Sequence, residues 1–208
     1  SAPCSAAAAT PNSTSNQTNA SGAQTIQSAD VALTTPALTS GTIYQGTSTN
    51  IIAAVKMDVT TASLTVNNIQ FTLSGNHDAD DLSYVSVYFN ASAPVISGAS
   101  YLGQTVATFV APHAYSININ RTLAAATSGY FIITVNVTSS ATDNKVVRIT
   151  GATTPITFGY TTTPNATSNQ TNASGAQTIQ SADVALTTSA TSAGNIVRGT
   201  STNIIYAA

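Results

Sequence analysis

The chain has 208 residues, of which 42% are apolar and only 6% are charged, and its net charge is −2. An average soluble domain carries about 25% charged residues, so the polar surface must consist mainly of Ser, Thr, Asn and Gln. Five basic residues argue against nucleic-acid binding, which needs clustered Lys and Arg. No apolar stretch reaches the ~20 residues of a membrane-spanning helix.

The first 23 residues are mostly Ala, Ser, Thr, Asn and Gln, a composition typical of a linker. From Gln24 onward apolar and polar residues alternate, as in a half-buried β-strand. Strands are predicted at residues 29–34, at Ile43–Tyr44 and over Asn50–Thr60. Over residues 64–73 the alternation changes parity at Asn67–Asn68, which predicts a β-bulge that keeps the apolar side chains on one face.

After the polar loop at residues 74–81, further strands are predicted at 84–89, 101–110, 115–119, 129–137, 146–149 and 156–160. The strand at 129–137 is the strongest, because Phe131, Ile133 and Val135 alternate with other residues along it. No stretch shows a helical period. Short strands at roughly 8–12-residue spacing, with turn residues between them, indicate an all-β fold, an antiparallel β-sandwich.

A 22-residue segment, TSNQTNASGAQTIQSADVALTT, occurs twice, at 14–35 and 167–188, with an offset of 153 residues. Solenoid repeats run roughly 20–50 residues, so this longer period indicates a tandem array of globular domains. We predict one complete unit at 24–163. The tail and linker of an earlier unit precede it at 1–23, and a linker with the first strands of the next unit follows at 164–208.

Three motifs resemble a repeat found in very large secreted proteins of Bacteroidota-type bacteria. They are GTSTNIIAAVKMDVTTASLTVNNIQFTLSG from Gly46, DDLSYVSVYFN from Asp80 and SGYFIITVNV from Ser128, within a region from Gly46 to Gly151. The resemblance implies an immunoglobulin-like β-sandwich, export by the type IX route and display on the cell surface. Proteins of that kind include gliding adhesins and the appendages of predatory gliding bacteria. This chain departs from them in its low charge and uniform linkers.

The loop at 74–81 is the most charged part of the chain. Its oxygen-bearing side chains, which would suit calcium, are Asn76, Asp78, Asp80 and Asp81. The loop lacks the following Gly and the distant Glu of an EF-hand. The other interpretation is a solvated loop in which Asp81 caps the turn before the next strand. No cofactor other than calcium is suggested.

No motif indicates catalysis. His77 and His113 have no neighbouring Cys and no zinc-ligand spacing, and we expect both in surface loops. The chain has no G-x-S-x-G elbow, and because it has no Glu, a carboxylate pair for glycoside hydrolysis would have to be two aspartates. We predict that it is not an enzyme. Cys4 lies outside the repeat and is either a passenger thiol or a link to another chain.

Two kinds of surface residue are candidates for contacts. Glycosylation acceptors of the Asn-x-Ser/Thr type in the two linker copies are Asn16, Asn19, Asn169 and Asn172, although a plain polar linker explains them equally well. Tyr84, Tyr88 and Tyr101 are expected to be exposed. Such rings form glycan-binding faces, cross-strand pairs or contacts between chains.

The tandem repeat and the low charge predict a structural repeat of an extracellular filament, appendage or adhesin stalk, and the resemblance implies that it stands on a bacterial cell surface and serves gliding, attachment or prey capture. The expected partners are copies of the chain itself, laterally or end to end, and cell-surface glycans. No nucleic acid and no membrane insertion are expected. The alternative is a calcium- or carbohydrate-binding recognition module of a secreted adhesin.

Overall fold

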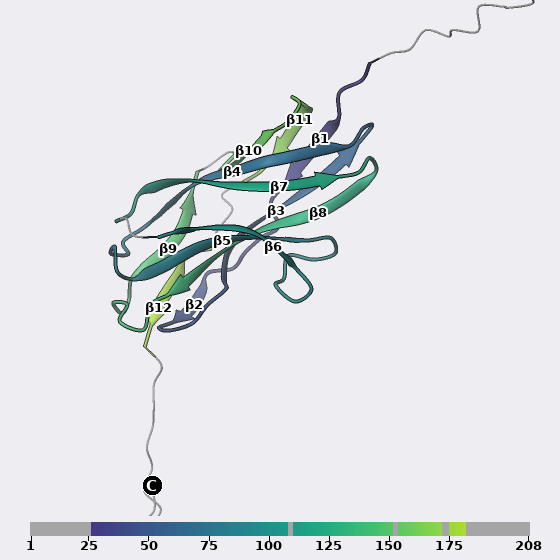
Figure 1. Cartoon of the computed structure of the whole chain (residues 1–208). Coiled ribbons are helices and arrows are strands. Elements are labelled where there is room, and N and C mark those ends of the chain that lie inside the picture. The colour runs from purple at the N-terminus through teal and green to yellow at the C-terminus, as the bar shows by residue number, and fades with distance from the viewer. Residues whose placement is uncertain (1–25, 108–109, 152–153, 172–174, 182–208) are drawn as a thin grey trace, which may run out of the picture.

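The structure, a computed structural model, describes residues 26–107, 110–151, 154–171 and 175–181. These residues form twelve strands and no helix, and the strands make two sheets packed face to face (Figure 1). The predicted all-β sandwich is therefore confirmed. Within the described residues no helix is long and apolar enough to cross a membrane.

Each sheet contains strands from both halves of the chain. The first runs in the order β11 (Asn165–Asn169), β1 (Asp30–Thr34), β3 (Asn50–Thr60), β8 (Thr127–Val137), β5 (Leu82–Asn90) and β6 (Ser100–Val106). The second runs β10 (Ile156–Tyr160), β4 (Leu64–Gly75), β9 (Val146–Thr150), β12 (Gln177–Gln180) and β2 (Gly41–Tyr44), and β7 (His113–Leu123) also pairs with β4.

The apolar alternation fills the space between the sheets, as predicted. Phe131, Ile133 and Val135 of β8 are fully buried. The bulge in β4 is also confirmed, because in the ladder with β10 Asn68 pairs with Gly159 and Val66 with the next residue, Tyr160, which leaves one extra residue in β4. The extra residue lets Val66 and Ile69 both point into the core.

The sheets are mixed rather than purely antiparallel. Two ladders are parallel: β1 with β11, and β2 with β12. Both join the first strands of the fold to the last ones. Parallel neighbours need a long connection between them, and here nearly the whole domain supplies it.

Residues from 164 onward, predicted as a linker and the first strands of the next unit, thus contribute two strands to the sheets of this domain. All five side chains of β11 are exposed. The strand is held at the edge of its sheet by the backbone ladder with β1, so its composition stays that of a linker.

Candidate functional site

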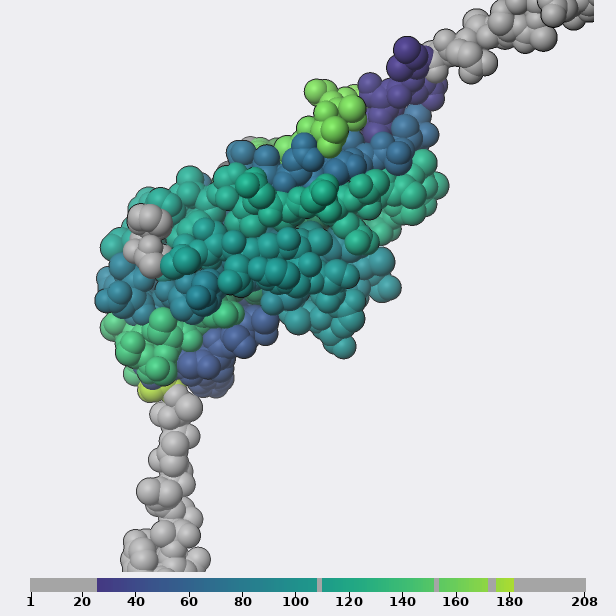
Figure 2. Space-filling view, in the orientation of Figure 1, coloured from purple at the N-terminus to yellow at the C-terminus, as the bar shows by residue number. Residues whose placement is uncertain are grey.

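The two ends of the sandwich carry different sets of hydrogen-bonded side chains. Figure 2 shows an elongated body, with the first described residues at one end and the last at the other. This follows from the parallel ladders, because the first and last strands run in the same direction. We call the end near Asp30 the N-terminal pole and the end near Ser181 the C-terminal pole.

The N-terminal pole is organised by the carboxylate of Asp30. Thr61 Oγ1 donates a hydrogen bond to its Oδ2, and Asn165 Nδ2 donates to its Oδ1 at 3.1 Å. These two hydrogen bonds lower the pKa of Asp30 below its usual value. The backbone N–H of Asn165 also donates to the carbonyl of Ala29 at 2.8 Å. One carboxylate therefore ties β1 to β11 and to the β3–β4 turn.

The C-terminal pole holds the end of β12. Asp143 accepts two hydrogen bonds from Ser181, from the backbone N–H at 2.6 Å and from the hydroxyl at 3.1 Å. Asn144 N donates to the Ile179 carbonyl at 2.8 Å, and Ile179 N donates to the Lys145 carbonyl at 2.7 Å. Residues 143–145 thus fix the last residues of the fold from both backbone and side chain.

Two glutamines in the linker-like stretch are buried. Gln170 donates from Nε2 to the Ile156 carbonyl at 2.9 Å and accepts from Ile156 N at 3.2 Å. Gln177 donates from Nε2 to the carbonyls of Thr39 and Gly175, at 3.0 and 3.2 Å. The Gln170 amide thus pairs both buried backbone groups of Ile156, and the Gln177 amide ties β12 to the segment before β2. The polar composition of the segment gave no indication that these glutamines are buried. Only the exact repetition of the whole segment pointed to a structural role for it.

The acidic loop lies at the C-terminal pole. Asp81 is only 2% exposed. Its Oδ2 accepts from Asp78 N at 2.7 Å and its Oδ1 accepts from Thr142 N at 2.6 Å. Asn76 Oδ1 accepts from Val146 N at 2.6 Å, and Asp78 forms an ion pair with Lys145 at 2.9 Å.

The loop oxygens therefore serve the structure of the pole. The capping role considered for Asp81 matches what its two oxygens do. Among the described residues, no group of three or more His, Cys, Asp or Glu side chains is placed to hold a metal ion. Calcium binding stays an untested expectation.

Replacing Asp81 with asparagine should lower the free energy of unfolding by about 2 kcal/mol, because hydrogen bonds to a charged acceptor contribute roughly 1.5–3 kcal/mol. One backbone N–H would then face an amide nitrogen. Urea unfolding measures the change. Asp80→Asn is the matched control, since Asp80 is exposed and should change little. Equal effects at both positions would contradict this role of Asp81.

His77 was expected on the surface, but it is 1% exposed. Burial lowers the pKa of its imidazole, while the Val146 backbone and the charges of Asp81 and Asp78 oppose the shift without cancelling it. The other histidine, His113, lies edge to face against the ring of Tyr115 at 4.8 Å.

The stability of the domain should fall as the pH drops below about 6.5. There the unfolded chain protonates His77 at its ordinary pKa, whereas the folded protein keeps the ring neutral until a lower pH. Protons bind the unfolded state first, so acid favours unfolding. Urea midpoints between pH 7.5 and 5 measure the effect. His77→Gln should flatten the dependence in this window, and an unchanged slope would contradict it.

Two of the three candidate tyrosines form a cross-strand pair. Tyr88 and Tyr101 lie opposite each other on β5 and β6, with ring centroids 5.6 Å apart. Tyr84 lies opposite Val106 in the same ladder, and both are exposed. The packing alternative therefore describes Tyr88 and Tyr101, and an inter-chain role for the three rings is untested.

Of the glycosylation candidates, Asn169 is exposed at the end of β11. Asn16, Asn19 and Asn172 lie outside the described residues, as does Cys4.

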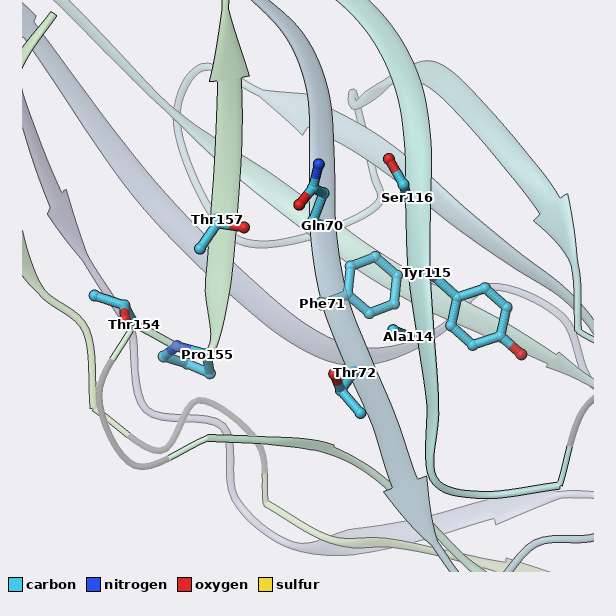
Figure 3. A pocket seen from close by; sticks show the side chains of 9 residues that line it. All are labelled: Gln70, Phe71, Thr72, Ala114, Tyr115, Ser116, Thr154, Pro155 and Thr157. Atoms are coloured by element: carbon cyan, nitrogen blue, oxygen red, sulfur yellow. The ribbon is translucent and has the colours of Figure 1, made fainter.

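A shallow hollow of about 440 Å³ lies on the second sheet, beside the turn that leads into β10 (Figure 3). Hydroxyl, amide and small side chains line it, together with two rings: Gln70, Phe71, Thr72, Ala114, Tyr115, Ser116, Thr154, Pro155 and Thr157. The hollow has no acid, base or histidine. Phe71 and Tyr115 are only 4% and 6% exposed, so neither ring offers a platform for stacking a sugar.

Comparisons with known proteins do not assign the chain to a family. No family model matches it, and no curated protein matches it. A chain from the crystal structure of a CaDoc0917–CaCohA2 complex at pH 5.5 is similar, at 15% identity and a TM-score of 0.32. That match covers 72% of this chain and 99% of the other. Similarity at this level does not identify a partner or a function.

Proposed function

We propose that this chain is part of an extracellular stalk or filament in which tandem β-sandwich units carry tension along their length. The observation that supports the proposal is the parallel pairing of the first and last strands, β1 with β11 and β2 with β12. The chain therefore enters at one pole and leaves at the other, as a head-to-tail array requires (Figure 1).

The same pairing sets how the unit meets a pulling force. Tension on the two chain ends draws β1 and β2 toward the N-terminal pole and β12 toward the C-terminal pole. The hydrogen bonds across β2–β12 then lie across the direction of pull and share the load. Strands peeled from one end would instead lose their bonds one at a time. The sandwich is therefore loaded in its stronger direction.

The surface suits packing against further copies of the chain. The edge strand β11 exposes Asn, Ala, Thr and Ser side chains without a charge or a proline. Natural edge strands usually carry charged residues or proline, which prevent pairing with another chain. In the proposed filament, lateral contact with another copy would cover this edge. Attachment, gliding and prey capture are the roles that this architecture would serve on a cell surface.

Single-molecule pulling tests the load-bearing role. In a Cys4→Ser background, one arrangement pulls on the two chain termini. A second pulls on the N-terminus and on a cysteine at the exposed Ala166, which pairs with Val31 near the start of the parallel ladder. The terminal arrangement should need a several-fold higher force. Equal forces would argue against a load-bearing unit.

The alternative is a recognition module, for which calcium titration and a glycan screen on the same chain are the direct tests. Saturable binding of either ligand would favour that alternative.

A further inference from the structure

The duplicated segment provides an internal comparison, because the same residues appear in two settings. Ile26 and Ile179 both lie in the sequence AQTIQSAD. Ile26 is 100% exposed, whereas Ile179 is 0% exposed and belongs to the core. Ile179 lies in β12, between β9 and β2. Ile26 therefore lacks, in this chain, the two partner strands that bury Ile179.

A serine in the same segment shows the same contrast. Ser181 donates two hydrogen bonds to Asp143 of the C-terminal pole. Its counterpart Ser28 is exposed at the N-terminal pole. The next residue, Ala29, is buried in the core of the described domain. Residues up to Ser28 thus have no place in this domain, whereas residues from Ala29 onward do.

We propose that Ile26 and Gln27 belong to the last strand of the preceding unit, as Ile179 and Gln180 belong to β12 here, and that one unit runs from Ala29 to Ser181. That span is one full period of 153 residues. The binding partner of Ile26 is then a second sandwich of this kind, with Ile26 filling the position that Ile179 fills here between the counterparts of β2 and β9.

In this arrangement every residue of the joint belongs to one of the two units, and none is left as a linker between them. The serine at position 28 is held by the Asp143 counterpart of the preceding unit, and Ala29 already lies in the core of the following one. Adjacent units therefore face each other pole to pole. The facing surfaces carry Asp143, Asn144 and Gln180 on one side, and Asp30, Thr61 and Asn165 on the other. Such a joint resists bending far more than a linker of ten residues would.

Hydrogen exchange on the 208-residue chain tests the first half of the inference. The two copies have the same local sequence, so their intrinsic exchange rates are equal. The amides of Ile179 and Gln180 should exchange at least about 100-fold more slowly than those of Ile26 and Gln27. Comparable rates in the two copies would overturn the assignment of unit boundaries.

A longer chain tests the joint. Residues 28–180 are inserted once more before Ser28, which preserves the natural Gln-Ser junction. Both copies of Ile179 should then be protected, and the two complete units should tumble as one body in NMR relaxation. Independent tumbling would overturn the stiff joint. Asp143→Asn in the first of the two units should loosen the joint. Asp58→Asn, on β3 of the same unit, is the control.

This inference rests on the tandem-array part of the proposed function, and the two fail separately. Low unfolding force between the termini would remove the load-bearing role and leave the unit boundaries intact. Loss of the exchange difference would remove the boundaries, whatever force the domain resists.

Discussion

Replacing Ile179 with alanine should lower the free energy of unfolding by about 2–5 kcal/mol, the usual cost of truncating a buried isoleucine and leaving a cavity. The same replacement at Ile26 should change it by less than about 0.5 kcal/mol. Ile179 is fully buried and Ile26 fully exposed within the same local sequence. Strand propensity and local unfolded-state effects are therefore matched, and the difference reports burial alone.

Urea unfolding measures both variants, followed by far-ultraviolet circular dichroism or by the fluorescence of the eight tyrosines, since the chain has no tryptophan. Ile179→Val should fall between the parent and Ile179→Ala, because it removes one methylene. Two results would contradict the prediction: a neutral Ile179→Ala, which would exclude β12 from the fold, or an Ile26→Ala as costly as its counterpart.

Much of the sandwich could be predicted from the sequence because most strands bury one face. Alternation in residues 50–60 and 129–137 reports that burial directly, and the change of parity at Asn67–Asn68 reports the bulge. These are local signals, and each can be read without knowing which strands pair.

The terminal strands could not be predicted in the same way. β11 has no buried side chain, and β12 has only two, Gln177 and Ile179. Gln170 and Gln177 are buried because folding brings backbone groups to their amides, and composition does not show this. His77 was misplaced for a related reason. A single polar residue inside a polar loop gives no sign that the loop folds over it.

The acidic loop stands out in the sequence as its most charged part, and a structural role for Asp81 is one of the two interpretations that its position allows. Asp143 and Asp30 organise the two poles, and no motif or spacing in the sequence distinguishes them. Their partners Ser181, Thr61 and Asn165 are common surface residues in a chain of this composition, so spacing alone could not single them out.

Replacing Phe131 with alanine should lower the free energy of unfolding by about 3–5 kcal/mol. Phe131 is fully buried and contacts Phe89 and Phe158, with ring centroids 5.3 and 5.1 Å apart. Phe89 and Phe131 belong to the first sheet and Phe158 to the second. Truncation therefore removes a contact between the sheets. Tyr101→Ala, which removes a half-exposed ring, is the control and should cost about 1 kcal/mol or less.

Under tension the unfolding forces of the Phe131→Ala and Ile179→Ala variants should differ. Phe131 lies on the central strand β8, away from the β2–β12 ladder that shares the load, so its loss should lower the unfolding force only slightly. Ile179 lies in that ladder, and its loss should lower the force strongly at a similar cost in free energy. Pulling both variants from their termini separates the two quantities. A Phe131→Ala variant that fails at as low a force as Ile179→Ala would place the load on the whole core instead of on the terminal strands.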